Sequence, residues 1–237
     1  MKNVVTILLC ILWALPILAQ KVIEKTIDHK DRYVELKVPF ASNIEVKTWD
    51  KSTVYFKADI ETEEGKYLDL YQLDVMEGSG AITIVSEPKA IFKEFQKEWK
   101  SKNEGKKKKY YSWNNEYEFN YVLYVPKNSE FRISSINGDM KSETIEGDFT
   151  ADLINGNIDI QTYRGNLDLS TINGEIDLKV SDASLVAETI NGDIYADEKL
   201  KLTTYDKHVG QKVEKRVSNA SKKLKLNTIN GNMYLRL

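Results

Sequence analysis

The sequence repeats the tripeptide Ile-Asn-Gly five times, and this repeat limits the folds open to the chain more than any other feature. The copies begin at residues 136, 154, 172, 190 and 229, so the first four are spaced by 18 residues. A related unit lies midway between them, at Ile145-Glu146-Gly147 and again at Tyr163-Arg164-Gly165. The underlying period is therefore nine residues within eighteen. A fixed period of this kind indicates stacked repeats whose neighbours bury a common core.

Apolar and polar residues alternate within each unit. Two residues after the glycine position stand Met140, Phe149, Ile158, Leu167, Ile176, Leu185 and Ile194. Four residues after it stand Ser142, Ala151, Ile160, Leu169, Leu178, Ala187 and Ala196. The position between them is mostly polar, and this period of two is typical of a strand with one buried face. We therefore expect an all-β solenoid with nine-residue half-coils, two of which make one eighteen-residue coil.

An antiparallel meander is the alternative fold, because Asn-Gly is also a strong signal for a two-residue hairpin turn. The isoleucine before each Asn-Gly bears on the choice. In a meander that buries the alternating positions, five isoleucines would face solvent, which is an unfavourable arrangement. In a solenoid a corner residue can point into the core. The sequence therefore favours the solenoid, with isoleucine filling the corner.

The other two members of the motif have predicted structural roles. The asparagines are expected to stack in one ladder in which each amide binds the next coil, and they are Asn137, Asn155, Asn173, Asn191 and Asn230. The glycines are expected to supply positive φ at the same corner, and they are Gly138, Gly156, Gly174, Gly192 and Gly231. A row of ligand-binding amides is the alternative role for the asparagines. Asn-Gly-Asp occurs only at 137–139 and 191–193, so the sequence predicts no metal and no cofactor.

The first residues indicate export. Lys2 precedes an apolar run from Val4 to Ala19, and the polar Gln20 follows, which is the layout of a secretory signal peptide over 1–19. The run is shorter than the roughly 20 residues that a membrane span needs; an uncleaved anchor is the alternative. Cys10, the only cysteine, follows Leu9 rather than the small residue of a lipoprotein signal. We expect a periplasmic or cell-surface protein without a transmembrane span after signal cleavage.

The rest of the chain is expected to be one domain, 20–237. Its coils would be irregular over 21–128 and regular over 129–237. Two lysine-rich insertions, near 88–118 and 197–226, interrupt the rhythm, and the second is expected to form a loop or hairpin. A separate β-sandwich over 21–128 is the alternative organisation.

The first insertion is the candidate partner-binding segment. Ile91, Phe92, Phe95 and Trp99 fall at helical spacing. A basic run then meets aromatic residues, and the candidate residues are Trp99, Lys106, Lys107, Lys108, Lys109, Tyr110, Tyr111 and Trp113. Such a cluster could hold a glycan, an anionic lipid surface or a partner protein. The alternative, which the sequence favours, is a helix and hairpin that cap the end of the solenoid.

The repeated units, together with the segment Ile44-Glu45-Val46-Lys47-Thr48-Trp49-Asp50, resemble the bacterial DUF4097/DUF2807 "putative adhesin" family, whose related head domain is named for a Gly-Ile-Asn motif. The resemblance covers nearly all of the chain after residue 20 and is strongest from Ser129 to Leu237. It implies a right-handed parallel β-helix and an envelope or surface location. It carries over no catalytic residue. The two insertions depart from the simplest family pattern.

The predicted function is therefore a non-catalytic envelope module that binds or supports another component. Its expected partner is an envelope protein or a glycan; the sequence leaves its oligomeric state open. The net charge of −2 gives no field that would attract nucleic acid. One alternative is a polysaccharide-acting enzyme that uses Asp159 and Asp177, expected one coil apart on one face. His29 and His208 stand without an obvious partner cluster and do not support catalysis. A periplasmic partner of a signalling system is the other alternative.

Overall fold

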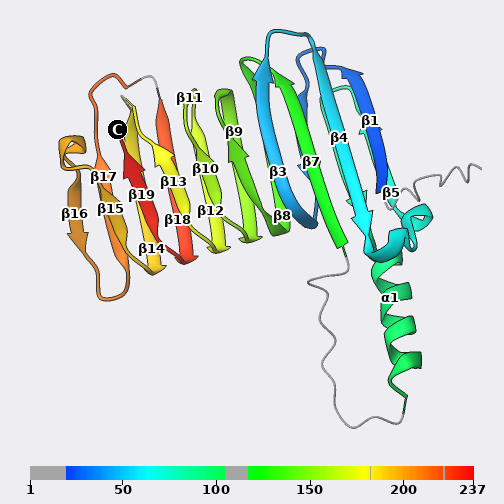
Figure 1. Ribbon diagram of the computed structural model, residues 1–237. Coiled ribbons are helices and arrows are strands. Elements are labelled where there is room, and N and C mark those ends of the chain that lie inside the picture. Colours follow the sequence, from blue (N-terminus) through cyan, green and yellow to red (C-terminus); the bar gives the residue numbers. More distant parts are fainter. Residues whose placement is uncertain (1–19, 105–116, 182, 221) are drawn as a thin grey trace, which may run out of the picture.

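The computed structural model describes residues 20–104, 117–181, 183–220 and 222–237, and over these residues the protein is almost entirely β-structure (Figure 1). The strands are β1 (Gln20–Asp28), β2 (Tyr33–Lys37), β3 (Phe40–Trp49), β4 (Thr53–Thr62), β5 (Gln72–Glu77), β6 (Ala81–Glu87), β7 (Tyr117–Pro126), β8 (Ser129–Ser142), β9 (Ile145–Asn155), β10 (Ile158–Ile160), β11 (Tyr163–Arg164), β12 (Leu167–Asn173), β13 (Ile176–Lys179), β14 (Ser184–Asn191), β15 (Ile194–Ala196), β16 (Thr203–Asp206), β17 (Gln211–Lys215), β18 (Lys223–Asn230) and β19 (Met233–Arg236). One α-helix, α1 (Lys89–Lys102), and three 3₁₀ turns, η1 (Glu63–Gly65), η2 (Leu68–Leu70) and η3 (Glu198–Leu200), complete the described elements. The predicted signal peptide, 1–19, lies outside the described residues.

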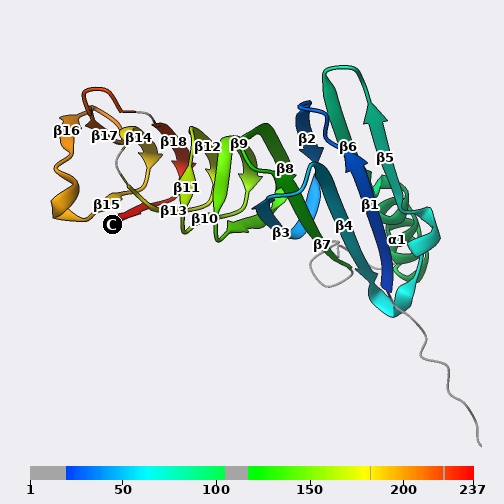
Figure 2. The ribbon, with the colours of Figure 1, turned by 90° about the horizontal axis from the view of Figure 1, so that it is seen from above.

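Apart from the short pair β9–β11, the paired strands form two layers that face each other, as the view from above shows (Figure 2). The first layer runs β5-β6-β2-β8-β9-β12-β18-β14-β17-β16. The second layer runs β1-β4-β7-β3-β8-β10-β13-β19-β15. The long strand β8 takes part in both layers, because the chain turns from one to the other near Gly138, where φ is +115°. Asn-Gly therefore marks a corner between layers.

The regular repeats pair in parallel, one coil upon the next. Ile158 pairs with Ile176 and Leu167 with Phe149, and both offsets equal the 18-residue sequence period. A hairpin at each Asn-Gly would instead place successive strands antiparallel. The meander is thereby excluded for the repeats.

The whole sheet is nevertheless mixed, so the prediction of parallel coils throughout was too simple. Antiparallel pairs join β1 to β4, β4 to β7 and β5 to β6 near the N-terminus. The second insertion forms the antiparallel hairpin β16–β17, and β17 also pairs antiparallel with β14. Short connections favour antiparallel pairing, because a parallel neighbour needs a longer crossover.

The last coil does not lie at the end of the stack. Strand β18 pairs with β12 on one side and with β14 on the other, and β19 lies in the same way between β13 and β15. The chain thus runs out to β14–β15, forms the hairpin, and returns to insert its final coil one place earlier. Because β17 covers the outer edge of β14, the returning strand takes the inner edge.

A continuous core lies between the two layers. Each regular strand turns alternate side chains inward; Leu167, Leu169 and Thr171 of β12 are all buried. The corresponding residues of neighbouring coils stack above and below, so one hydrophobic cluster extends from Ile27 to Leu235. Burying a leucine contributes about 2 kcal/mol. The N-terminal strands β2 and β3 join the same pairing system through β8.

Candidate functional site

The five motif asparagines form one ladder along the corner edge. Asn155 donates its side-chain amide to Asn137 (3.0 Å), Asn173 to Asn155 (2.8 Å) and Asn230 to Asn173 (2.7 Å). Asn191 completes the ladder by donating to Asn230 (2.9 Å). Each interior asparagine therefore both donates and accepts a hydrogen bond, so a single amide side chain links its coil to the coils on both sides.

Glycine is required in this motif mainly by close packing of backbones, and the prediction of positive φ at all five was wrong. Among the motif glycines only Gly138 has a positive φ, of +115°. A Cβ atom added to Gly174 would overlap the carbonyl oxygen of Gly156, and one added to Gly231 would overlap that of Gly174. Stacked corners leave no room for a side chain. Positive φ instead recurs at the other corner, at Gly147 and Gly165.

A hydroxyl residue, not the isoleucine, fills the inner side of the corner. Thr171 is buried and donates to the carbonyl oxygen of Gly156 at 2.9 Å, and Thr228 does the same to Gly174 at 3.0 Å. Ser135 occupies the equivalent place in the first copy and donates to Val38. These bonds satisfy carbonyl groups that the turn removes from the strand ladder. The motif is thus better written Thr/Ser-Ile-Asn-Gly, with leucine in the second copy.

The isoleucines point outward, which contradicts the predicted filling of the corner. Their exposed fractions lie between 38% and 45%, and they are Ile136, Ile154, Ile172, Ile190 and Ile229. Because inward and outward side chains alternate along a strand, the inward hydroxyl places the next residue outside. Parallel register brings the five into one row, in the same order as the asparagine ladder. We call this row the isoleucine stripe.

Two shallow hollows lie on this edge. One is lined by Ile136 and Ile154 together with Pro39 and Val85. The other is lined by Ile172, Ile190 and Ile229. Together the two hollows contain all five isoleucines, so the stripe borders both of them.

Most residues beside the stripe are acidic or neutral; the exception is Lys37, which lines the hollow at Ile136 and Ile154. Rows of aligned side chains flank it on both layers, and their carboxylates are Asp139, Asp152, Glu175, Glu188 and Asp193. Arg132 pairs with Asp152 (2.7 Å), and Lys207 pairs with Glu188. Within the described parts of the chain, the other three carboxylates have no ion-pair partner. The edge therefore combines an apolar stripe with a local excess of negative charge.

The carboxylates proposed for an enzyme lie on the outer surface of the second layer. Asp159 and Asp177 are in register on β10 and β13. Arg236 of β19 holds Asp177 in an ion pair at 2.6 Å, and Lys141 is the register neighbour of Asp159 on the other side. The two aspartates are neighbours of like charge with a cation on each outer side, an arrangement that fits a solvated sheet face.

The first insertion folds into a helix that packs on the N-terminal end of the layers. The buried face of α1 consists of Ile91, Phe92 and Phe95. The ring of Phe92 meets those of Phe40 and Tyr117 edge to face, with centroids 4.7 and 5.0 Å apart. The helix of the predicted cap is therefore present and packed on the core, while the chain from 105 to 116, which completes the predicted cap, lies outside the described residues.

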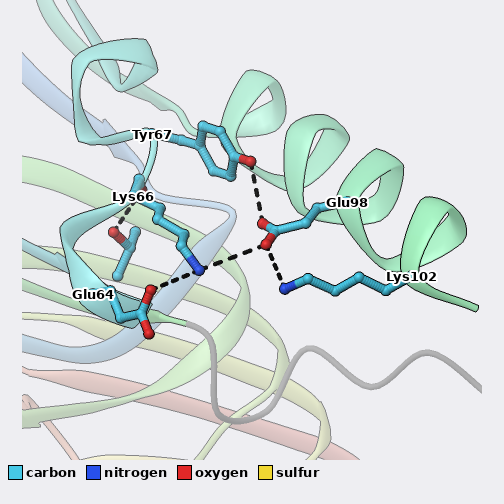
Figure 3. Close-up of polar contacts among 6 residues, drawn as sticks. Glu64, Lys66, Tyr67, Glu98 and Lys102 are labelled. Atoms are coloured by element: carbon cyan, nitrogen blue, oxygen red, sulfur yellow. Dashed lines mark hydrogen bonds and ion pairs between the residues drawn. The ribbon is translucent and has the colours of Figure 1, made fainter.

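Polar contacts fasten the same helix to η1 and η2 (Figure 3). Glu98 accepts from Lys102 (2.6 Å) and from the hydroxyl of Tyr67 (3.2 Å). Lys66 lies 3.6 Å from Glu98 and 2.8 Å from Glu64. The hydrogen bond from Lys102 lowers the pKa of the Glu98 carboxyl, so this carboxylate stays charged to a lower pH than an isolated glutamate.

Of the candidate partner-binding residues, the structure places only Trp99, which is half-buried on α1. The remaining ones lie outside the described residues: Lys106, Lys107, Lys108, Lys109, Tyr110, Tyr111 and Trp113. The structure therefore places one residue of the predicted site, Trp99, and does not describe the basic run 106–109.

Sequence reasoning missed an aromatic patch on the outer side of the second layer. Trp49, Tyr55 and Tyr124 come from three neighbouring strands, with ring centroids 4.8 to 6.2 Å apart. Lys51 lies over the Trp49 ring at 4.5 Å, and Lys47 lies over Tyr124 at 5.6 Å. Only the register β4–β7–β3 brings these residues together. The sequence signal was limited to tyrosines and a tryptophan at alternating strand positions.

Comparison with known proteins supports the architecture alone. No family model matches the sequence, and no curated protein matches it. The fold is similar to that of a solved structure named a "putative cell adhesion protein" from Clostridium sporogenes, with a TM-score of 0.58 and 11% identity, covering 92% of this chain and 99% of that one. The other matches include a "putative adhesin" from Parabacteroides merdae (TM-score 0.40, 11% identity, 91% and 81% covered) and a "putative lipid binding protein" from Parabacteroides distasonis (TM-score 0.35, 10% identity, 91% and 96% covered).

The described helix α1 is too short and too polar to cross a bilayer, and no other described helix qualifies. The class that fold and edge define is thus an all-β protein of stacked strands with an exposed repetitive edge.

Proposed function

We propose that this chain is an exported, non-catalytic binding module of the bacterial envelope. In this proposal the repeats form a right-handed β-helix of eighteen-residue coils, and the isoleucine stripe is the contact surface. The 18-residue parallel offsets support the helix, and the fold likeness to a "putative cell adhesion protein" supports a binding role. The apolar run before Gln20 supports export.

The stripe carries this proposal. Single exposed apolar side chains are normal on soluble proteins, whereas contiguous apolar patches mark interaction sites. Here five isoleucines are exposed and contiguous because their strands are stacked in register. A threonine at each of these positions would keep the β-branched shape and expose less apolar surface to water. The isoleucines are only partly exposed, so their replacement can also change stability, and the test must separate stability from binding.

The experiment compares two double variants of the mature chain. Ile154→Thr with Ile172→Thr removes neighbouring rungs of the stripe. Val22→Thr with Val186→Thr removes exposed apolar side chains elsewhere, with exposed fractions of 48% and 38%. Co-sedimentation with washed envelope fragments is expected to fall for the stripe variant and to stay at the wild-type level for the control. If both variants are folded by circular dichroism and co-sediment with the envelope fragments equally well, the stripe is not the contact surface.

Export is tested separately, by fusing residues 1–30 to a reporter enzyme that is active only outside the cytoplasm. We expect activity from this fusion and none from a fusion that begins at residue 20. N-terminal sequencing of the exported protein is expected to begin at Gln20. A retained leader would support the uncleaved anchor instead.

A polysaccharide-acting enzyme is the second candidate, and the register pair Asp159–Asp177 is the observation that favours it. Conversion of both to asparagine would abolish any hydrolysis of envelope polysaccharide that the wild-type protein shows. The ion pair of Arg236 with Asp177 supports a structural use of that carboxylate, so we expect no hydrolysis from either protein.

A further inference from the structure

The surroundings of the isoleucine stripe indicate which kind of partner it fits, an inference that rests on the proposed function. The four rows at the corner edge are the isoleucines, the asparagines and the rows that flank them in each layer. Across the five repeats these rows hold five carboxylates and no lysine, arginine or histidine. Cations from neighbouring positions pair with two of the carboxylates, Arg132 with Asp152 and Lys207 with Glu188, and Lys37 lines the hollow at Ile136 and Ile154. The whole chain carries a net charge of only −2. Within the described residues, those of the five carboxylates without an ion-pair partner therefore lie on one side of the stripe, in the row next to the asparagine ladder.

Three of these carboxylates remain available to a partner's cations. Asp139, Glu175 and Asp193 occupy the row next to the asparagine ladder and make hydrogen bonds with neighbouring coils, such as that from the backbone amide of Asn157 to Asp139 (2.8 Å). Within the described residues none of the three has a lysine or arginine within ion-pair distance. Opposite charge on a partner would be steered to this side of the stripe.

The dimensions of the stripe fit one helix. Strands in a sheet lie about 4.8 Å apart, so five rungs extend about 19 Å from first to last. An α-helix rises 1.5 Å per residue, so about 13 residues cover that length. An amphipathic helix buries an apolar ridge in a groove of this type and keeps its charged flanks beside it. A second copy docked through the same edge would bring carboxylates rather than cations to the row next to the asparagine ladder, which disfavours it.

We propose that the isoleucine stripe binds a cationic amphipathic helix of a partner protein. The apolar ridge of that helix lies along Ile154, Ile172 and Ile229, at the middle of the stripe. Its lysines or arginines lie beside Asp139, Glu175 and Asp193. Amide side chains of the asparagine ladder lie between the two zones and supply donors and acceptors.

The probe is a labelled synthetic peptide of leucine and lysine, about 14 residues long, with its leucines on one helical face. Two control peptides have the same leucine content. In one the same residues are scrambled so that no apolar face forms, and in the other glutamate replaces lysine. Fluorescence anisotropy is expected to show binding of the amphipathic cationic peptide and at least about tenfold weaker binding of both controls. Equal binding of the scrambled peptide would overturn the proposal, because attraction would then be charge alone.

Protein variants locate the binding site. Ile154→Thr with Ile172→Thr is expected to weaken binding about tenfold, while Val22→Thr with Val186→Thr leaves it unchanged. Asp139→Asn, Glu175→Gln and Asp193→Asn together keep their hydrogen-bonding oxygens and are expected to weaken binding and flatten its salt dependence. The matched acidic control is Glu61→Gln, Glu63→Gln and Asp74→Asn, all exposed and distant from the edge.

Two results would contradict the inference, and they bear differently on the proposed function. If no cationic peptide binds while the stripe variant still loses envelope retention, the contact surface stands and the partner chemistry is wrong. If the peptide binds equally well to the folded stripe variant, the helix site lies elsewhere on the protein.

Discussion

Asn230 donates a 2.7 Å hydrogen bond to Asn173, a residue 57 positions earlier in the chain. Asn191, which precedes Asn230, accepts nothing from Asn173 and instead donates to Asn230 itself. The asparagine ladder thus records the actual stacking order, in which the last coil lies between two earlier ones. The same order completes the isoleucine stripe.

Asn173→Ala tests what the ladder contributes to stability. The change removes two side-chain hydrogen bonds, to Asn155 and from Asn230. Because each exposed amide bond contributes at most about 1 kcal/mol, we expect a loss of about 1–2 kcal/mol in the free energy of unfolding. Urea denaturation measures it. Asn43→Ala is the control, since it removes one exposed bond, to Asn120, outside the ladder, and a loss as large as that of Asn173→Ala would deny the ladder a special role.

Gly174→Ala tests the close approach of stacked corners. The added methyl group would overlap the carbonyl oxygen of Gly156, and overpacking against backbone costs about 3 kcal/mol. Gly80→Ala is the matched control, because nothing lies within 4 Å of a Cβ atom at that position. Thermal unfolding is expected to show a large decrease in Tm for the first and little change for the second. Equal Tm values would mean that the coils can move apart at no cost.

His29 predicts a dependence of stability on pH. It is buried, and its Nε2 atom has no hydrogen-bond partner. Burial disfavours the imidazolium ion and lowers the pKa of His29 below its ordinary value of 6.5. The unfolded chain therefore binds the proton more readily, so this stabilisation is complete above pH 6.5 and declines as the pH falls toward the lower folded pKa.

The measurement is urea denaturation at several pH values between about 7.5 and about 5 for the wild type and His29→Gln. The wild type is expected to lose more stability than the variant over this range. His208→Gln, at an exposed position, is the control and should follow the wild type. Identical pH dependence of wild type and His29→Gln would contradict the account of His29.

The repeat made the strand alternation, the corners and the asparagine ladder predictable, because all three depend on spacing within one coil. The direction of the isoleucines was predicted wrongly. Alternation along the strand continues to the corner, so Thr171 follows Leu169 to the inner side and Ile172 faces out. Leu153 takes the same inner place in the second copy without a hydroxyl, and the bond from Thr171 to the Gly156 carbonyl adds to this arrangement.

Pairings between distant segments were beyond the sequence pattern. The coils at 184–196 and 223–237 bury the same alternating positions, so the sequence pattern alone allows either of them to pair with β12. The hairpin β16–β17 decides, since β17 occupies the outer edge of β14. The aromatic patch of Trp49, Tyr55 and Tyr124 depends likewise on a register that alternation leaves open.

The stacking order is tested most directly by disulfide cross-linking in a chain that lacks Cys10. Asp168 and Lys225 are paired across β12 and β18, whereas Val186 lies one strand further. A disulfide needs Cα atoms about 4.4–6.8 Å apart, and two strand spacings amount to about 10 Å. The account predicts that Asp168→Cys with Lys225→Cys forms an intramolecular disulfide, and that Asp168→Cys with Val186→Cys does not. Efficient cross-linking of the second pair in place of the first would show that the coils stack in chain order, and would contradict the inserted last coil and the order of the isoleucine stripe.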